Sequence, residues 1–563
     1  MSSRSSKSKK KKPIKHFDAI GGYHGVSAIF PKFQDVLDYE EKKINVNQGY
    51  PRFVTHPLIR NLEDKYRREY NATASLCCHS YKSALFLMID YYYFEGTRFY
   101  IQGIITKRLY NLLKDKFPNL TEEVDKHKAN ILFITEDPFK NTHKGKEKKV
   151  VKLYPLGKLE NLKRNNDFDL IIFRERNTNC GIILFYNELA EKIEKFRRHT
   201  GFISSSRKIA KLKDPTLNQS NNKNDIKKKL KSSLSKLEKL QPNNCFLYPS
   251  GMAAVFSSIH AVLSEKNSKI ISLGNLYVDT LKILEKWPEK YNLSNSAQIL
   301  DDYTTNLKNE IDSNTSAIIF EIPSNPLLEV IDVQKIISIA KRNNIKVIVD
   351  NTIATPYNFN PFDYDADIVV HSTTKFLNGK NNHIGGVLFT KNKKLMKKIG
   401  SFKEHIRLSL HRSEMRVLSE NLGGFESRME KINKNAINVA RFLQNHKAVQ
   451  QVHYPGLKEN SSYEMMKKYM KGGSGLISFT LKPSNNHSAT TFYNNVNLPI
   501  KKGPSLGSEE TLMCPYVIFA HYKDSKKKLK RLGLDFYLMR LSVGIEPVKE
   551  IISSLRNALN LLL

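Results

Sequence analysis

A lysine, Lys375, follows a strongly apolar run (ADIVV, 366–370) in the segment HSTTKFLNG. A lysine amine that is held close to an aldehyde and partly desolvated can form a Schiff base with it. Asp350 ends another apolar run, KVIVD, 25 residues earlier. A carboxylate at this point either caps the next turn or keeps the nitrogen of a pyridine-type ring protonated, so that the ring accepts carbanion electrons. Taken singly, both residues have ordinary structural explanations.

An anion-binding pattern precedes these residues in the chain. Ser250-Gly251-Met252 follows the run FLYP and begins a helical pattern, so free N–H groups at the helix start could face an anion. Ser372 and Thr374 flank the lysine segment and could add hydroxyl donors to the same phosphate. A lone Ser-Gly turn is weak evidence, because many helices begin in this way.

Three further residues could contact a planar cofactor or an amino-acid substrate. Tyr277 could stack on a flat ring, although a tyrosine is ordinarily core or rim. Asn325, in the segment PSNP, is by default a turn residue. Arg540 interrupts an otherwise apolar strand (LMRLSVG), where a guanidinium needs a partner such as a substrate carboxylate held by two hydrogen bonds.

The elements that carry these residues alternate regularly between strand and helix. Solid apolar runs separated by amphipathic stretches predict a mostly parallel sheet covered on both faces by helices. Ligands of such sheets bind at the carboxyl ends of the strands, which is where the candidate residues fall. The predicted strands and helices are 246–263 (strand, turn, helix), 269–274, 316–326, 333–344 (helix), 346–352, 366–375 and 385–390.

The rest of the chain predicts additional α/β units. Residues 109–117 have helical spacing, and 129–137, 168–175 and 180–186 have the pattern of strands, the last two buried on both faces. The C-terminal third predicts a long helix (427–446), strands at 475–482 and 538–544, and a final amphipathic helix (548–563). No internal repeat is visible. The expected divisions are a basic disordered tail (1–15), an N-terminal α/β extension (16–210), a basic linker and helix (211–245), a large domain (246–425) and a C-terminal domain (426–563).

The composition limits the class of protein. The 563 residues carry a net charge of +36, with lysines crowded into polar tails and loops, so we expect solvated basic surface rather than a nucleic-acid site. Five scattered cysteines form no CxxC pair or zinc pattern, which favours a reducing compartment and no metal. The basic start has no apolar signal-peptide core, and no apolar run is long enough to span a membrane. We therefore expect a cytoplasmic protein; a nuclear location is also compatible with the sequence.

The order of these motifs resembles the pyridoxal-phosphate (PLP) enzymes of cysteine and methionine metabolism, also called trans-sulfuration enzymes. The resemblance covers about residues 246–563, over half of the chain. It implies the fold-type I α/β architecture, in which a large, mostly parallel sheet domain precedes a smaller C-terminal α/β domain. The motifs are PSGMAA (249–254), LYVDT (276–280), EIPSNP (321–326), VDNTIATPY (349–357), DIVVHSTTKF (367–376), GG (385–386), VHYPGL (452–457), GGSGLISF (472–479), SLGSEETL (505–512) and MRLSVGIE (539–546).

The resemblance implies a role for each matching residue. Lys375 would be the Schiff-base and proton-transfer lysine, Asp350 the partner of the pyridine nitrogen, and Tyr277 the residue that stacks on the ring. Gly251, Met252, Ser372 and Thr374 would hold the cofactor phosphate, and Asn325 would lie near the phenolic oxygen. Ser505 and Arg540 would orient the substrate, with Arg540 binding the α-carboxylate. Members of the family form homodimers or homotetramers, so the resemblance implies at least a dimer.

The first half of the chain narrows the resemblance to fungal cystathionine γ-synthases with a long N-terminal extension. The matching segments are GYPRFVTHPLIRNLE (49–63), SLCCHSYKSA (75–84) and RRHTGFISSSRKIAK (197–211). The implied reaction is γ-replacement, in which cysteine displaces the ester group of an activated homoserine. A sulfhydrylase, a cystathionine lyase and a catalytically impaired PLP-binding regulatory protein remain alternatives.

Two departures from the family pattern concern the cofactor site. Where the family has G-H-x-D after its lysine, this chain has Gly379-Lys380-Asn381-Asn382. A Tyr-x-Arg pair, which relatives supply to the phosphate from a neighbouring subunit, is present as Tyr50-Pro51-Arg52. That pair lies about 200 residues before Ser250 instead of the usual few tens, so the sequence does not show which residues complete the phosphate site.

Overall fold

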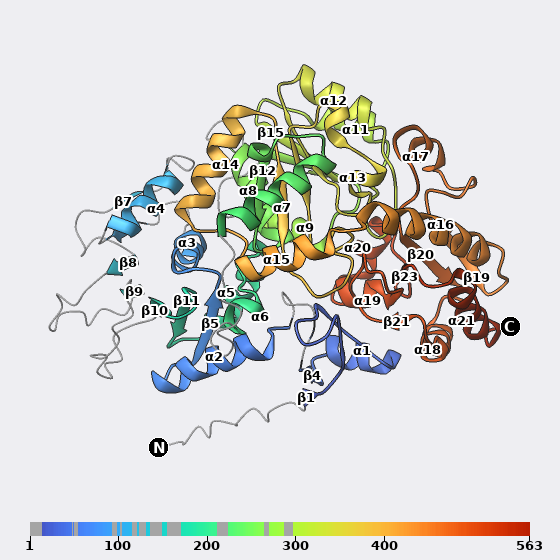
Figure 1. The fold of residues 1–563 in the computed structure, drawn as a ribbon, viewed down its shortest axis with the longest axis horizontal. Helices are drawn as coiled ribbons and strands as arrows, with labels where there is room; N and C mark the ends of the chain where they lie inside the picture. Colours follow the sequence, from blue (N-terminus) through green and yellow to red (C-terminus); the bar gives the residue numbers. More distant parts are fainter. Residues whose placement is uncertain are drawn as a thin grey trace.

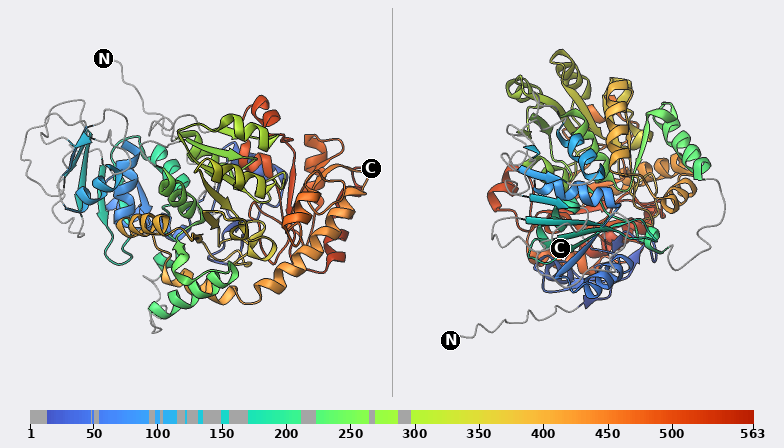
Figure 2. Two further views of the ribbon diagram at one scale, coloured as in Figure 1. Left: turned by 90° about the horizontal axis from the view of Figure 1, so that it is seen from above. Right: turned by 90° about the vertical axis from the view of Figure 1, so that its left-hand side faces the viewer.

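Three units lie side by side in the structure, which is a computed structural model (Figure 1). The N-terminal extension, the large domain and the C-terminal domain follow one another along the long axis, and a view from above shows the same order (Figure 2). The residues that the structure describes are 14–47, 49, 54–92, 98–101, 104–114, 121–122, 131–134, 149–154, 170–210, 223–263, 269–286 and 297–563.

The large domain is built on a seven-stranded sheet of order β12-β18-β17-β16-β15-β13-β14. Only β18 runs antiparallel to its neighbours, so the mostly parallel sheet expected from the sequence is confirmed. Its elements are β12 (Cys245–Tyr248), α8 (Gly251–Val262), β13 (Lys269–Leu273), α9 (Val278–Lys286), β14 (Ala297–Ile299), α11 (Tyr303–Glu310), β15 (Thr315–Glu321), α12 (Val333–Arg342), β16 (Lys346–Asp350), α13 (Thr355–Asn358), β17 (Ile368–His371), β18 (Gly386–Phe389), α14 (Lys393–His405) and α15 (Arg412–Asn421).

The apolar pattern of the strands explains their burial. All seven residues of β15 and all four of β17 are buried, because helices cover both faces of the sheet. The covering helices have cap signals in the sequence: Asp332 accepts the Lys335 N–H at the start of α12, and basic Lys341 and Arg342 occupy its last turn.

The C-terminal domain contains a five-stranded sheet of order β19-β20-β23-β22-β21. Helices α16 and α18 both pack against α21 beside this sheet. The predicted long helix, both predicted strands and the final helix are confirmed. The elements are α16 (Phe425–Gln444), β19 (Val449–His453), α17 (Tyr463–Tyr469), β20 (Leu476–Leu481), α18 (Asn486–Asn495), β21 (Lys501–Lys502), β22 (Leu512–Pro515), α19 (Tyr516–His521), α20 (Lys526–Arg531), β23 (Met539–Ser542) and α21 (Val548–Asn560).

Residues 14–47 pack against the C-terminal domain, although they belong in sequence to the N-terminal extension. The Phe30 N–H donates to the Lys502 carbonyl (2.8 Å), and the Tyr493 hydroxyl donates to the Phe30 carbonyl (2.9 Å). Phe33 and Val36 are buried in the same hydrophobic cluster as the C-terminal sheet. The elements of this N-terminal segment are β1 (Ile14–Lys15), β2 (Ala19–Ile20), β3 (Ser27–Ala28), α1 (Phe33–Glu40) and β4 (Asn45–Val46).

The extension holds a second seven-stranded sheet, of order β5-β11-β10-β9-β8-β6-β7. Only β11 is antiparallel to its neighbours. When the strands of each sheet are numbered from first to last along the chain, the two sheets have the same strand order. In both sheets the last strand in the chain is the antiparallel one. The elements are α2 (Pro57–Glu69), β5 (Ala74–Cys78), α3 (Tyr81–Tyr92), β6 (Arg98–Ile101), α4 (Ile104–Lys114), β7 (Thr121–Glu122), β8 (Ile131–Ile134), β9 (Lys149–Tyr154), β10 (Leu170–Arg174), β11 (Gly181–Phe185), α5 (Ala190–Thr200), α6 (Ser206–Ala210) and, leading into the large domain, α7 (Lys223–Leu237).

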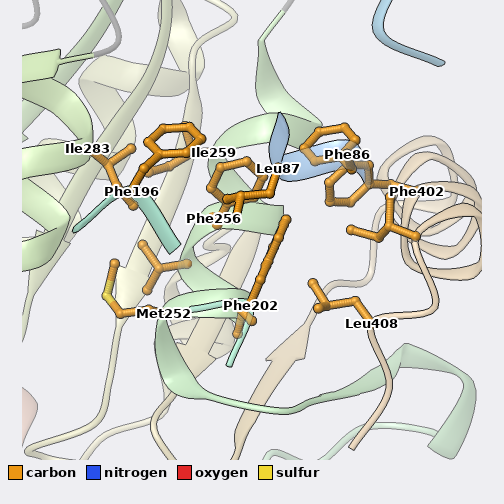
Figure 3. Packing of buried hydrophobic residues seen from close by; sticks show 14 of the residues in the cluster. Phe86, Leu87, Phe196, Phe202, Met252, Phe256, Ile259, Ile283, Phe402 and Leu408 are labelled. Atoms are coloured by element: carbon orange, nitrogen blue, oxygen red, sulfur yellow. The ribbon is translucent and has the colours of Figure 1, made fainter. Parts of the chain in front are cut away.

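One hydrophobic cluster joins the extension to the large domain. Phe86 and Phe202 of the extension pack with Phe256 and Phe402 of the large domain in a group of aromatic rings (Figure 3). Within the described residues, no helix is both long enough and apolar enough to cross a membrane.

Candidate active site

A cleft opens where β15, β16 and β17 end and α8 begins. Most of the candidate residues line it, although they come from distant parts of the sequence. Those in the lining are Gly251, Met252, Tyr277, Asn325, Asp350, Ser372, Lys375 and Arg540. Ser505 and Thr374 are not in the lining; each lies directly behind it.

Lys375 extends into the cleft from the turn that follows β17. Its Nζ donates to the Ser505 Oγ (3.0 Å), and Ser505 is buried. The segment bearing Ser505 approaches the lysine turn closely, since a Cβ on Gly507 (φ +75°) would come within 2.5 Å of the Phe376 nitrogen. The hydroxyl therefore holds the amine in one place without neutralising it.

Two carboxylates, one buried and one partly buried, face the cleft beside the lysine. Asp350 and Glu321 pair directly across β16 and β15. Burial raises the pKa of Asp350, against hydrogen bonds from the Thr352 hydroxyl and N–H and the charge of His371. Burial and the charge of Asp350 raise the pKa of Glu321 well above its usual range, against a hydrogen bond from the Tyr277 N–H. A cationic N–H placed between these groups would relieve the repulsion.

The opposite end of the cleft offers groups that suit an anion. Ser250 caps α8 by accepting the Ala253 N–H (3.0 Å), which leaves N–H groups of the first turn open to the cleft. A Cβ on Gly251 would lie 2.8 Å from the Ser372 Cβ, so glycine permits this close approach. The Thr374 hydroxyl accepts the Gly385 N–H (3.1 Å), which directs it to the backbone behind the cleft.

Arg540 lies in the floor of the cleft with 5% of its surface exposed. Its guanidinium donates to the Asn325 Oδ1 (3.2 Å) and to the Pro504 carbonyl (2.7 Å), and it covers the ring of Tyr516 at 4.7 Å. Among the described residues, no carboxylate lies within ion-pair distance of it. Since a buried cation without a counter-charge is costly, the arrangement suits an incoming carboxylate.

The N-terminal segment forms a wall of the cleft that sequence reasoning did not find. Ala28, Phe30, Tyr39 and Val46 line it, together with Glu40 at the end of α1. Burial raises the pKa of Glu40 to about 7, against the charges of Lys523, Arg198 and Lys282. These residues match no motif, and only the tertiary packing of residues 14–47 reveals them.

A buried polar chain supports the segment that carries the lysine. Thr373 Oγ1 and His383 Nε2 lie 2.9 Å apart, and His383 Nδ1 is 2.9 Å from Glu414 Oε2. Arg207, on α6 of the extension, completes the chain with an ion pair to Glu414 at 3.3 Å. This positioning chain was also missed, because its members are far apart in the sequence.

The two departures from the family pattern both point to the N-terminal segment. In the run that replaces G-H-x-D, the Asn381 carbonyl accepts the Val26 N–H (2.8 Å). Tyr50-Pro51-Arg52 lies outside the described residues, but Gly49 and Val54 on either side of it line the cleft.

Comparison with known proteins agrees with the family resemblance of the sequence motifs. Residues 193–560 match the family described as Cys/Met metabolism PLP-dependent enzyme. A cystathionine β-lyase from Lactococcus lactis is 35% identical over 320 residues, 56% of this chain and 81% of the lyase. A cystathionine γ-synthase from Neurospora crassa is 34% identical over 344 residues, 59% of this chain and 54% of the synthase. The crystal structure of cystathionine γ-synthase from Xanthomonas oryzae pv. oryzae in complex with cystathionine has a TM-score of 0.56 at 25% identity, covering 60% of this chain and 86% of that one.

Proposed function

Since this chain belongs to the Cys/Met metabolism PLP-dependent enzyme family, we propose that it is a cystathionine γ-synthase. It would join cysteine to an activated homoserine ester and release the ester group. The supporting observation is the length of the aligned region. The Neurospora synthase, like this chain, has a long part outside the match, whereas the Lactococcus lyase is covered to 81%.

The residues of the cleft fit the cofactor of the family. The first turn of α8 and Ser372 would hold its phosphate, the carboxylate of Asp350 would hold its ring nitrogen, and Tyr277 would lie against its ring. When bound, PLP acts as an electron sink that acidifies the bonds at the substrate Cα. Trans-sulfuration chemistry of an amino-acid substrate therefore follows from the family and from the donor set together.

Lys375 would move the protons of the reaction. Its amine extends into the cleft, where a bound cofactor and the substrate carbons would come within its reach. The Ser505 hydroxyl, 3.0 Å away, orients the amine when it is not covalently engaged. A γ-replacement requires proton removal at Cα and then at Cβ, and a single mobile base can serve both positions.

Arg540 and Asn325 would fix the α-carboxylate of the substrate. Arg540 is held by Asn325 and by the Pro504 carbonyl, so the guanidinium is already oriented before the substrate arrives. A bidentate carboxylate contact would then set which substrate bonds face Lys375.

The apolar wall formed by the N-terminal segment favours replacement by a thiol over replacement by water. Phe30, Tyr39, Val46 and Val54 cover one side of the cleft with side chains that exclude water. A cysteine thiol entering beside this wall would meet the activated γ-carbon in place of a water molecule.

Product analysis tests the proposal. The protein is supplied with O-acetylhomoserine and either cysteine or sulfide, and separately with cystathionine alone. We expect cystathionine from the cysteine mixture and little cleavage of cystathionine. Homocysteine from sulfide would identify a sulfhydrylase, and rapid cystathionine cleavage would identify a lyase.

The matched control uses two lysines of one segment. Lys375→Ala should remove both the yellow colour of the bound cofactor and turnover, whereas Lys380→Ala, at an exposed position, should keep both. A colourless wild-type protein would instead favour a regulatory protein without catalysis. We further propose a cytoplasmic homodimer or homotetramer, which sedimentation of the purified chain would test.

A further inference from the structure

The two seven-stranded sheets correspond at particular paired residues, not only in strand order. In the extension, Gly181 of β11 pairs with Cys78, and in the large domain Gly386 of β18 pairs with Tyr248. Two residues after Cys78 comes Ser80, and two after Tyr248 comes Ser250. Ser80 accepts the Ser83 N–H at 3.0 Å, as Ser250 accepts the Ala253 N–H at 3.0 Å.

The two glycines also serve the same purpose. A Cβ on Gly181 would lie 2.5 Å from the Ser80 carbonyl oxygen, and one on Gly386 would lie 2.3 Å from the Ser250 carbonyl oxygen. The extension is therefore a second copy of the large-domain fold, and α3 is the counterpart of α8.

The copies contact each other reciprocally. The Ser250 hydroxyl of the large domain donates to the carbonyl of Gly201, which ends α5 of the extension, at 2.9 Å. In the same way, the Ser80 hydroxyl of the extension donates to the carbonyl of Ile406, which ends α14 of the large domain, at 2.9 Å. Phe86 and its counterpart Phe256 meet edge to face, with centroids 6.3 Å apart (Figure 3). Such exchange of equivalent contacts is the mark of a two-fold interface, here made within one chain.

The extension lacks counterparts of Asp350 and Lys375. Strand pairing places Leu153 of β9 where the large domain has Asp350. The turn between β10 and β11 is reduced to residues 175–180, which contain no lysine. The second copy can therefore neither hold a ring nitrogen in the same way nor form a Schiff base at the equivalent position.

The equivalent cleft persists and is basic. It has an empty space of about 1580 Å³ and contains the first turn of α3, Arg174 at the end of β10, and the end of α14. Lys82, the counterpart of Met252, faces Arg407 of the large domain, and burial together with the charge of Arg407 lowers the pKa of Lys82. No Asp or Glu is among the lining residues.

Two buried polar groups in this cleft lack a suitable partner. Lys403 is only 9% exposed, and no described carboxylate lies within ion-pair distance of it; its Nζ donates to the Ser409 hydroxyl. Burial, with the charges of Lys227 and Lys231, lowers its pKa to about 7. The Nδ1 of His79, a residue 5% exposed, has no hydrogen-bond partner in the described part of the chain. Burial and the charge of Lys208 lower the pKa of His79 well below its usual range, and its ring bonds the Ser409 backbone, so the free Nδ1 is an acceptor that suits the P–OH of a hydrogen phosphate. The buried Lys403 amine, which has no counter-charge among the described residues and lies beside a helix start, suits an anion.

We propose that this cleft is a second anion site, which binds a phosphate group noncovalently between the two copies. The first turn of α3, His79, Lys82, Lys403 and Arg407 would surround the phosphate. The ligand would be inorganic phosphate or a small phosphomonoester, and the proposal does not depend on which reaction the first cleft catalyses.

The test uses the full chain with its cofactor fixed in the first cleft by borohydride, so that added phosphate reports only the second. Titration calorimetry with inorganic phosphate and, separately, with glycerol 3-phosphate should show one saturable site per chain. The double variant Lys82→Ala/Arg407→Ala should bind at least about tenfold more weakly, since hydrogen bonds to charged groups contribute about 1.5–3 kcal/mol each. Lys482→Ala/Lys549→Ala, exposed positions of the C-terminal domain with the same loss of charge, should bind like the parent.

The outcomes separate cleanly. Tighter binding of glycerol 3-phosphate than of phosphate identifies an organic ligand, and the reverse order identifies the free ion. Absence of saturable binding, equal weakening in both double variants, or full affinity in Lys82→Ala/Arg407→Ala would each overturn the proposal. A thermal unfolding transition like that of the parent in every variant shows that the fold is intact.

Discussion

Asp350 and Glu321 face each other on neighbouring parallel strands; Glu321 is buried and Asp350 is partly buried. Because burial raises both pKa values and the charge of Asp350 raises that of Glu321 further, the pair favours one shared proton unless a cation lies between them. Asp350→Asn removes the charge that would keep the cofactor ring protonated. We expect turnover to fall by about 10²–10⁴-fold, the range typical of a lost acid–base partner, while the yellow colour is retained.

Glu321→Gln is the matched control for that substitution. Glu321 also accepts the Tyr277 N–H, a bond that a glutamine oxygen can keep, so its replacement should cost much less activity. Steady-state rates and the absorbance spectrum check both variants. Equal losses in the two would show that Asp350 has no special relation to the ring nitrogen.

Arg540→Lys should separate substrate binding from chemistry. Lysine keeps the charge but cannot make the bidentate contact or keep both bonds to Asn325 and the Pro504 carbonyl. KM for the homoserine ester should rise by about 10–100-fold, corresponding to roughly 1.5–3 kcal/mol for a hydrogen bond to a charged group. A lower kcat at unchanged KM would contradict a role in holding the carboxylate.

Glu414 makes the stability of the lysine segment sensitive to acid. Burial alone would raise its pKa, but the hydrogen bond and charge of His383 and the charge of Arg207 outweigh burial and lower the pKa to about 2. A carboxylate with a lowered pKa contributes stability above its unfolded pKa, near 4.5, and this contribution is lost as the pH falls toward 2. The contribution is roughly 3 kcal/mol.

Urea unfolding as a function of pH checks that expectation. Glu414→Gln should be less stable than the parent at pH 7, and the difference should shrink as the pH falls below 4.5. A difference that stays constant with pH would mean that the carboxylate charge is not what stabilises the segment.

Phe86→Ala should loosen the contact between the two copies of the fold. Phe86 is fully buried and meets four other aromatic rings from both copies, so its loss should cost about 3–5 kcal/mol of unfolding free energy. Leu498→Ala, at a position 76% exposed, should change stability by less than about 0.5 kcal/mol. Thermal denaturation of both variants tests whether the extension and the large domain unfold together.

Much of the large and C-terminal domains is predictable from the sequence, because each element has a clear local signal. The runs around Asp350 and Lys375 are apolar over whole strands, and the motifs that follow them match a known family. The wall formed by Phe30 and Tyr39 could not be predicted in this way, since it depends on contacts between residues almost 500 positions apart.

The duplicated fold was also invisible in the sequence, where no repeat can be seen. Few identities remain between the copies: Ser80 matches Ser250, Gly181 matches Gly386 and Phe86 matches Phe256, but Leu153 replaces Asp350. Backbone topology tolerates most apolar exchanges in buried strands, so strand order persists after the residues that reveal a repeat have changed.

The reciprocal contact of Ser80 and Ser250 has a genetic consequence. In an assembly of identical subunits, every mutation is introduced on both sides of the two-fold axis at once. Here the two sides are encoded separately, so either one can change while the other stays intact. Covalent linkage also keeps the two copies together at any dilution. The extension, which has no counterpart of Lys375, is therefore free to acquire a function of its own.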